Sequence, residues 1–217
     1  MRIVAFVPVR LNSKRLTGKN LKMLAGKPLM YYVPETLSQV KTIDEIYVFC
    51  SSEEVKSYLP EGVKFLKRSE HLDRDETLGG EIYDAFVNAI DADLYILAHT
   101  TSPFIKASTI ENAIKKIKHE KYDSALSVEK IQTFAWYDGK PLNYALNHVP
   151  RTQDLNPVLV ETSAFFMFKK EVWKTKKQRI GDNPYFSIID KIEGVDIDTP
   201  DDFAFAEMVA KSCSNKK

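Results

Sequence analysis

Residues 3–20 have the sequence IVAFVPVRLNSKRLTGKN, and the rest of the chain is organised around this stretch. The apolar run from Ile3 to Val9 is typical of a strand that is covered on both faces. It stops at Arg10, where a loop begins that holds four cations in ten residues. The loop lacks the G-x-x-x-x-G-K-[ST] spacing with which backbone amides wrap a phosphate. If it binds phosphate, the charge must therefore come from side chains.

The loop offers several side chains for that purpose. Arg10 presents a planar fork suited to two phosphate oxygens, and Lys14 and Lys19 present point charges. Asn12 and Ser13 can donate neutral hydrogen bonds. The alternative is a solvated basic loop, because runs of charge usually face water. The loop residues alone leave both interpretations open.

Length and composition bound the class of protein. With 217 residues, of which 44% are hydrophobic and 28% charged, the chain can form one domain with a sizeable core, and we expect no second full domain. A formal net charge of +1 argues against a partner such as nucleic acid or a membrane surface. Two cysteines, Cys50 and Cys213, make no disulfide framework, and no secretory signal is visible. We therefore expect a cytoplasmic protein.

Strand and helix signals alternate along the chain. The expected strands cover residues 45–50, 63–66, 94–98 and 125–128, and the expected helices cover 28–40, 53–58, 81–90 and 109–119. Repeated units of this kind predict an α/β fold, with a mostly parallel, Rossmann-like sheet and helices on both faces. Such sheets bind ligands beyond the carboxyl ends of their strands. Arg10 and His99 both follow strand ends, so we expect them near that crevice.

A second group of polar residues lies at 195–202, in the sequence VDIDTPDD. On a strand, Asp196 and Asp198 would face the same side with Cα atoms about 6.6 Å apart. Two such carboxylates can hold one octahedral cation, such as Mg²⁺, together with phosphate oxygens. Thr199 is expected to cap a helix that has Pro200 at its first position and includes 203–210. The alternative, that the acidic residues only cap this helix, explains Asp201 and Asp202 but not the two earlier carboxylates.

Residues 131–155 interrupt the alternation and contain WYDGKP, which is typical of a hairpin-like excursion around a turn. The aromatic sequence at 134–137 would be an unusual exposed patch on a monomer. We consider two interpretations of this segment, a surface flap and a dimerisation or substrate-capping element. The tail from Lys211 to Lys217 is expected to be frayed.

Two motifs resemble those of the acylneuraminate cytidylyltransferase family, whose members make CMP-activated sialic acids and related sugar acids. The first is P-x-R-x-x-S-K-x-x-x-x-K-N at residues 8–20, followed by AGKPL at 25–29, and the second is the DIDTP sequence at 196–200. The resemblance covers about residues 3–210. It implies a single domain of the nucleotide-diphospho-sugar transferase type, in which an acceptor oxygen attacks the α-phosphorus of CTP and pyrophosphate leaves.

The resemblance also implies roles for individual residues. Catalytic roles fall on Arg10, Lys19 and Asp198, and the metal ligands are Asp196 and Asp198. The nucleotide-binding residues are Arg10, Asn12, Ser13, Lys14, Lys19, Asn20 and Arg68.

Elements that hold the sugar acid are present in altered form. His99 stands where the family has glutamine, RTQDL at 151–155 resembles R-x-Q-D-L, and Thr162-Ser163 replaces Asn-Gly. The implied acceptor-binding residues are His99, Arg151, Gln153, Thr162 and Ser163. Family members use residues 131–155 across a homodimer interface, which implies a homodimer here. The altered residues predict a narrower, differently polar pocket, and we expect N-acetylneuraminic acid to be a poor substrate.

Other classes of function remain open. A cytidylyltransferase for a small phosphorylated or phosphonate acceptor would have the same nucleotide half. A nucleic-acid-binding module would explain the basic loop, but Asp196 and Asp198 would repel a phosphate backbone in the absence of metal. A kinase or other NTPase would require a P-loop or a kinase glycine loop, and the sequence has neither.

Overall fold

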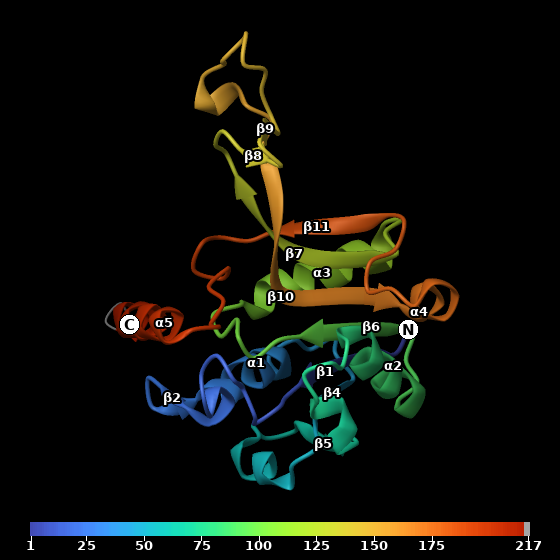
Figure 1. Ribbon diagram of the computed structural model, residues 1–217. Coiled ribbons are helices and arrows are strands. Elements are labelled where there is room, and N and C mark those ends of the chain that lie inside the picture. Colours follow the sequence, from blue (N-terminus) through green and yellow to red (C-terminus); the bar gives the residue numbers. More distant parts are fainter. Residues whose placement is uncertain (215–217) are drawn as a thin grey trace.

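A seven-stranded sheet, in the order β11-β7-β10-β6-β1-β4-β5, forms the centre of the molecule (Figure 1). The computed structural model describes residues 1–214. Neighbouring strands are parallel except at β10, which runs antiparallel to both β6 and β7. The predicted α/β fold with a mostly parallel sheet is confirmed. The strands are β1 (Ile3–Pro8), β4 (Glu45–Cys50), β5 (Lys64–Lys67), β6 (Leu94–Ala98), β7 (Ser124–Ile131), β10 (Val158–Lys169) and β11 (Pro184–Ile188).

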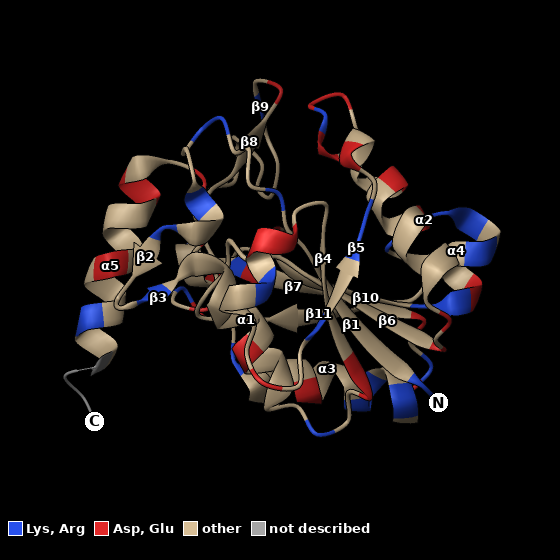
Figure 2. Cartoon of the chain, turned by 90° about the horizontal axis from the view of Figure 1, so that it is seen from below, with Lys and Arg blue, Asp and Glu red and all other residues tan. Residues whose placement is uncertain are grey.

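Helices cover both faces of the sheet. Alternate residues of β1 point to opposite sides, so each face presents apolar side chains against which helices pack. Ala5 and Val7 pack in one core cluster with residues of α1 (Leu29–Ser38) and α3 (Ala107–His119). Val4 and Phe6 pack in another with residues of α2 (Gly79–Ala89) and α4 (Lys170–Lys176). Figure 2 shows these helices on both sides of the sheet, with basic and acidic residues interspersed over the surface. Every residue from Ile3 to Val7 is at most 1% exposed, as expected for a strand covered on both faces.

A third cluster attaches the C-terminal helix α5 (Pro200–Ser214) to the N-terminal third of the chain. Phe203 of α5 packs with Leu24 of β2 (Met23–Leu24) and with Leu29, just beyond β3 (Lys27–Pro28). The helix begins at Pro200, as expected from a cap at Thr199, and it ends later than predicted, since it includes part of the segment expected to be frayed. Residues 215–217 lie outside the described part of the chain.

Some local predictions were wrong. Residues 195–198 form no strand, because the segment runs beside a loop rather than beside a strand. Its contact with that loop is a hydrogen bond from the amide of Ile197 to the carbonyl of Thr101 at 2.9 Å. The segment expected as a helix at 53–58 is the 3₁₀ helix η2 (Glu53–Tyr58). No strand was expected at β10 or at the edge strand β11, although the apolar run at 164–168 is typical of a buried strand. The remaining 3₁₀ helices are η1 (Lys19–Leu21), η3 (Glu70–Asp73) and η4 (Thr152–Asp154).

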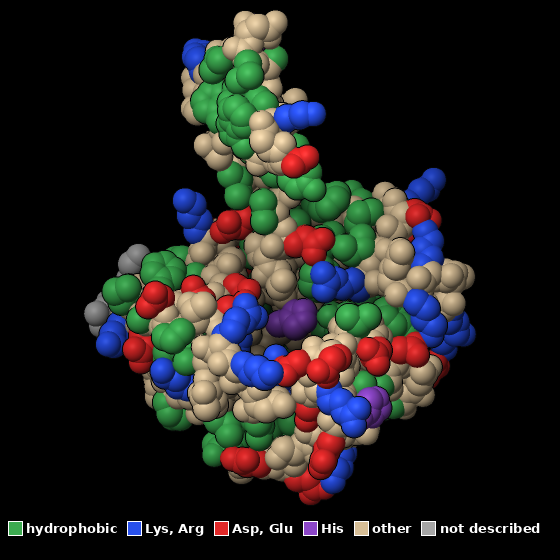
Figure 3. Space-filling view, in the orientation of Figure 1, with side chains coloured by type: hydrophobic (Ala, Val, Ile, Leu, Met, Phe, Trp, Pro, Cys, Tyr) green, Lys and Arg blue, Asp and Glu red, His purple; other side chains and the backbone are tan. Residues whose placement is uncertain are grey.

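Residues 131–155 form an arm that projects from the body of the molecule (Figure 1). β7 and β10 continue their pairing into its base, where Ile131 lies opposite Val158. The arm carries the short strands β8 (Trp136–Tyr137) and β9 (Lys140–Pro141). Trp136 is 56% exposed, and hydrophobic side chains gather along the arm in Figure 3. No helix within residues 1–214 is both long and apolar enough to cross a membrane.

Candidate active site

A cavity of about 460 Å³ lies beyond the carboxyl ends of β1 and β6, which is the position expected for a ligand site in a parallel sheet. Figure 3 shows charged side chains of both signs around the corresponding hollow. Five predicted residues of the basic loop contribute to its lining, together with four from the later segments. They are Arg10, Ser13, Lys14, Lys19 and Asn20, and His99, Ser163, Asp196 and Asp198.

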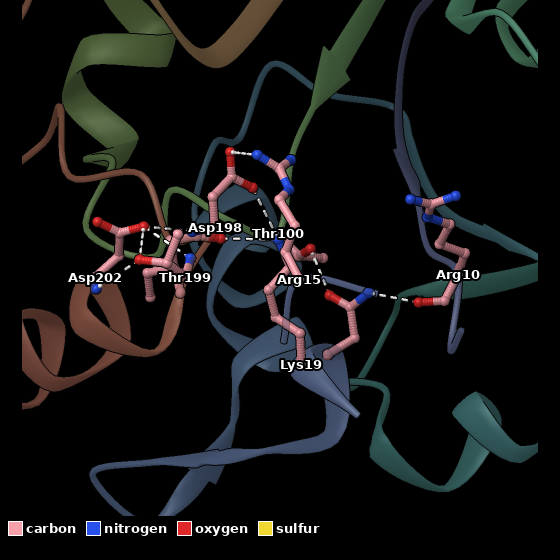
Figure 4. A network of polar contacts seen from close by, with 9 residues as sticks. Arg10, Arg15, Lys19, Thr100, Asp198, Thr199 and Asp202 are labelled. Atoms are coloured by element: carbon pink, nitrogen blue, oxygen red, sulfur yellow. Dashed lines mark hydrogen bonds and ion pairs between the residues drawn. The ribbon is translucent and has the colours of Figure 1, made fainter. Parts of the chain in front are cut away.

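Lys19 joins the basic loop to the acidic segment. Its side chain is 9% exposed, and its Nζ donates to the carbonyl of Ile197 at 2.8 Å and to Oδ1 of Asp198 at 3.1 Å (Figure 4). Arg15 reaches the other carboxylate oxygen of Asp198 at 2.8 Å. Asp198 is thus held between two cations. Arg15 also lines the cavity. It was not among the predicted site residues, because it occupies a variable position of the loop motif.

Asn20 fixes the shape of the loop. Its Nδ2 donates to the carbonyl of Arg10 at 2.7 Å, and its Oδ1 accepts from Thr100 Oγ1 at 2.6 Å. The side chain is buried, and both of its polar atoms have a protein partner. Asn20 therefore connects the ends of β1 and β6 at the floor of the cavity. Figure 4 shows the guanidinium of Arg10 pointing away from this network.

Asp75 faces the outer cations of the loop. Its Oδ1 lies 3.6 Å from Arg10 Nη1, and its Oδ2 pairs with Lys14 Nζ. The hydrogen bond from Lys14 lowers the pKa of Asp75 below its ordinary value. A carboxylate therefore occupies the position opposite the two cations that we expected to bind phosphate. No motif in the sequence had pointed to Asp75.

Arg68 and Asn12 do not line this cavity, in contrast to the expectation that both contact nucleotide. The Arg68 side chain is 1% exposed, and its Nη2 donates to Asp73 Oδ1 at 2.6 Å. Its Nε and Nη1 have no hydrogen-bond partner within residues 1–214. Asn12 donates to the carbonyl of Asp73 at 3.2 Å. Both side chains donate to Asp73 and so hold in place the segment that precedes Asp75, a residue of the cavity lining.

A bulge in β10 forms the opposite wall. The pairing shifts between Glu161 and Phe166, and Ser163 adopts a φ of 59°, a left-handed conformation that favours glycine. Ser163 lines the cavity. Thr162 does not, because its Oγ1 donates to the buried Ser127 Oγ at 2.9 Å. The expectation that Thr162 contacts an acceptor therefore finds no support in its orientation.

His99 is hydrogen-bonded to this bulge. Its Nδ1 lies 2.6 Å from the carbonyl oxygen of Ser163, so Nδ1 carries the hydrogen and donates it. Burial lowers the pKa of His99 below its ordinary value. The imidazole is therefore favoured in its neutral form, with Nε2 left as a hydrogen-bond acceptor.

Arg151 and Gln153 lie on the arm and not at the cavity. Arg151 is 75% exposed, and its Nε donates to Asp154 Oδ2 at 2.8 Å. Gln153 is exposed in η4. Within one chain, the structure does not bring these two residues together with His99 and Ser163.

Two carboxylates are available for a cation. Asp196 lines the cavity beside Asp198, and burial raises its pKa above the ordinary value. Within residues 1–214 no group of three or more His, Cys, Asp or Glu side chains is arranged to hold a metal ion. Magnesium commonly takes one or two carboxylates and completes its shell with phosphate oxygens and water. The pair fits a metal that binds together with a phosphate-bearing substrate.

Asp202 and Thr199 hold the acidic segment in place. Asp202 Oδ2 accepts from the amides of Asp198, at 3.0 Å, and Thr199, at 2.8 Å. The Thr199 hydroxyl in turn accepts from the amide of Asp202 at 3.3 Å. The predicted helix cap at Thr199 is confirmed.

Residues 4–216 match the family model described as cytidylyltransferase. The chain belongs to this family. It is 28% identical over 215 residues to N-acylneuraminate cytidylyltransferase A of Danio rerio, a match that covers 94% of the chain and 50% of that protein. It is 30% identical over 226 residues to CMP-N,N'-diacetyllegionaminic acid synthase of Legionella pneumophila, with 95% of each covered.

The chain spans about half the length of the N-acylneuraminate cytidylyltransferases that it matches. A solved structure of CMP:2-keto-3-deoxy-manno-octonic acid synthetase complexed with CTP superposes with a TM-score of 0.74 at 16% identity. That likeness covers 98% of this chain and 99% of the other. It confirms the expected nucleotide-diphospho-sugar transferase fold.

We predict that Lys19→Ala lowers the free energy of unfolding by about 2–4 kcal/mol, because it leaves a buried carbonyl without its donor and removes one cation from Asp198. The matched control is Lys14→Ala, because the Lys14 side chain is 76% exposed and its removal should change stability little. Urea denaturation followed by circular dichroism would measure both. Equal denaturation midpoints for the two variants would contradict a structural role for Lys19.

Proposed function

We propose that this chain is a CTP-dependent cytidylyltransferase that transfers CMP to an acidic, sugar-acid-like acceptor and releases pyrophosphate. One observation carries the proposal: the cations of residues 10–19 and the carboxylates of Asp196 and Asp198 line one cavity. Membership of the cytidylyltransferase family supports the same conclusion. Sugar acids appear in the names of relatives with similar sequences.

The proposed reaction needs little covalent chemistry from the protein. An acceptor hydroxyl oxygen attacks the α-phosphorus of CTP, the bond to the β-phosphate oxygen breaks, and the hydroxyl proton is released. Catalysis then depends on positioning and on neutralising charge. Arg10 and Lys14 would exchange Asp75 for the triphosphate, with Ser13 as a neutral donor. Lys19 and Arg15 would keep Asp198 oriented.

Asp196 and Asp198 would hold Mg²⁺ together with phosphate oxygens. When bound, the cation would neutralise phosphate charge and polarise the attacking oxygen. Lys19, in direct contact with Asp198, would fix the position of that carboxylate relative to the α-phosphate. The buried Asn20 would keep the loop in register with the end of β6.

A second candidate acceptor class is a small phosphorylated or phosphonate compound. The observation that favours it is the replacement of a family glycine by Ser163, whose side chain narrows the cavity wall. Neutral His99 at the same wall gives a hydrogen-bond acceptor but no positive charge. We favour the sugar acid because relatives of similar length act on one by name.

We further propose that the chain forms a homodimer through its arm. Trp136, Tyr137 and Leu146 are 56%, 76% and 67% exposed, which is much apolar surface for a short projecting segment. Two arms related by a two-fold axis would cover this surface in a self-complementary way. Such an arrangement would also carry Arg151 and Gln153 toward the partner's cavity.

The proposed activity is tested by pyrophosphate release with each of the four NTPs and a panel of acceptors. We expect release with CTP and a sugar acid, and less with the other NTPs. For N-acetylneuraminic acid we expect a kcat/KM below ~10⁴ M⁻¹s⁻¹, because Ser163 and His99 change the acceptor wall. Absence of release with CTP and every sugar acid, but release with a phosphonate, would favour the second acceptor class.

Asp196→Asn and Asp198→Asn should each lower kcat by about 10²-fold or more, with the larger loss at Asp198, because an amide is a weak ligand for Mg²⁺. The matched control is Asp201→Asn, which changes an exposed carboxylate in the first turn of α5. Mn²⁺ affinity in the presence of CTP, measured by electron paramagnetic resonance, gives a second readout. Normal activity and normal Mn²⁺ affinity in both variants would place the metal elsewhere.

Charged substitution on the arm should release monomers. Trp136→Glu places an uncompensated charge in the proposed interface, whereas Lys118→Glu changes an exposed charge in the last turn of α3, outside the arm. Sedimentation velocity at micromolar concentration should show a dimer for the wild type and for Lys118→Glu, and a monomer for Trp136→Glu. A wild-type monomer would refute the proposed assembly.

A further inference from the structure

Arg179 lines the cavity and pairs with Glu161 of β10. It follows α4 and precedes β11, in a segment where no motif was recognised. It lines the cavity beside His99 and Ser163. It also lines a second cavity, of about 460 Å³, between α2 and α4. Arg179 therefore contributes to the walls of both cavities.

Contacts on two sides hold the guanidinium in place. Its Cζ is 3.7 Å from the centroid of the Phe166 ring, and Phe166 is fully buried. Its Nη2 lies 3.2 Å from Oε2 of Glu161. The charge of Arg179 contributes, after burial, to the lowered pKa of His99, which places the two side chains near each other. A guanidinium fixed in this way loses little freedom when it binds a ligand.

Arg179 retains capacity for an anion. A guanidinium has five N–H donors, and Glu161 is its ion-pair partner among residues 1–214. Glu161 is 45% exposed, so its pairing with Arg179 is open to water and can be exchanged. The other cations that line the cavity are paired differently, Arg10 and Lys14 with Asp75, and Arg15 and Lys19 with Asp198.

The lining of the cavity falls into two groups of residues that contact one another. The loop cations pair with the carboxylates of Asp75 and Asp198, as binding of a triphosphate and a cation would require. His99 and Arg179 instead contact β10, at Ser163 and at Glu161. Arg151, the arginine that sequence motifs suggest for the acceptor, is on the arm and outside this cavity. Within one chain, Arg179 rather than Arg151 is therefore the arginine available to an acidic acceptor in this cavity.

We propose that Arg179 binds the carboxylate of the acceptor and so selects sugar acids in which that carboxylate is next to the attacking hydroxyl. This inference rests on the proposed cytidylyl transfer. A bidentate contact fixes two oxygens in one plane. The hydroxyl on the adjacent carbon is then held at a fixed distance from the guanidinium, facing the triphosphate half of the cavity. His99 Nε2 and the Ser163 hydroxyl remain for neutral groups of the sugar.

The test compares each free acid with its methyl ester, which keeps the shape but loses the charge. The probes are N-acetylneuraminic acid, N,N'-diacetyllegionaminic acid and 2-keto-3-deoxy-manno-octonic acid. Calorimetry gives the binding of acid and ester, and pyrophosphate release gives the KM for acceptor and for CTP. The variants are Arg179→Gln and Arg179→Lys, with Lys177→Gln as the matched control. Lys177 lines the neighbouring cavity but not this one.

We expect the wild type to prefer an acid to its ester. Arg179→Gln should weaken binding of the acid at least 10-fold, abolish the preference over the ester, and leave the KM for CTP within twofold. Arg179→Lys should be intermediate, because a point charge keeps attraction but loses the planar fork. Lys177→Gln should behave as the wild type.

Two results would overturn the role of Arg179. One is an unchanged preference for acid over ester in Arg179→Gln, and the other is a parallel rise in the KM for CTP. Calorimetry needs no turnover, so it separates this inference from the proposed activity. An acid that binds through Arg179 without pyrophosphate release would reject the cytidylyl transfer alone, whereas a wild type that binds none of the acids would reject the role of Arg179.

Discussion

The buried ammonium of Lys19 holds together parts of the chain that are far apart in sequence. It binds the carbonyl of Ile197 and the carboxylate of Asp198, 178 and 179 residues away. A buried charge without partners would be strongly unfavourable, so this contact must form whenever the domain is folded. The neighbouring Asn20 adds the ends of β1 and β6 to the same junction. The shape of the candidate active site depends on these two consecutive residues.

The cations of the cavity are balanced inside the protein. Asp75 pairs with Arg10 and Lys14, and Asp198 pairs with Arg15 and Lys19. The chain as a whole has a net charge of +1. A loop with four unpaired cations would repel itself and would attract any polyanion. The carboxylates of Asp75 and Asp198 reduce this repulsion while the cations stay in place. Under the proposed function, a triphosphate would replace Asp75 beside Arg10 and Lys14, so that one anion would be exchanged for another.

The sequence predicted the first strand, the alternation of strands and helices, and the two polar segments that meet at the cavity. Each of these signals is local, since it depends on periodicity or on residues close in the chain. Arg68 was assigned to nucleotide from its motif position, yet its side chain is buried against Asp73. Thr162 was assigned to the acceptor, yet it is hydrogen-bonded to Ser127. Ser127 is 35 residues from Thr162 in the sequence, whereas Asp73 is only five from Arg68, and no periodicity or motif reports either contact.

β10 connects the arm to the cavity without an intervening loop. The strand begins at Val158 in the base of the arm, passes through the bulge at Ser163, and continues into the core beside β6. Its left-handed residue is fastened to His99 by one short hydrogen bond. The backbone of β10 is thus one continuous path from the arm to the cavity wall that holds His99. A displacement of the arm at its base would reach the hydrogen bond that fixes the tautomer of the imidazole.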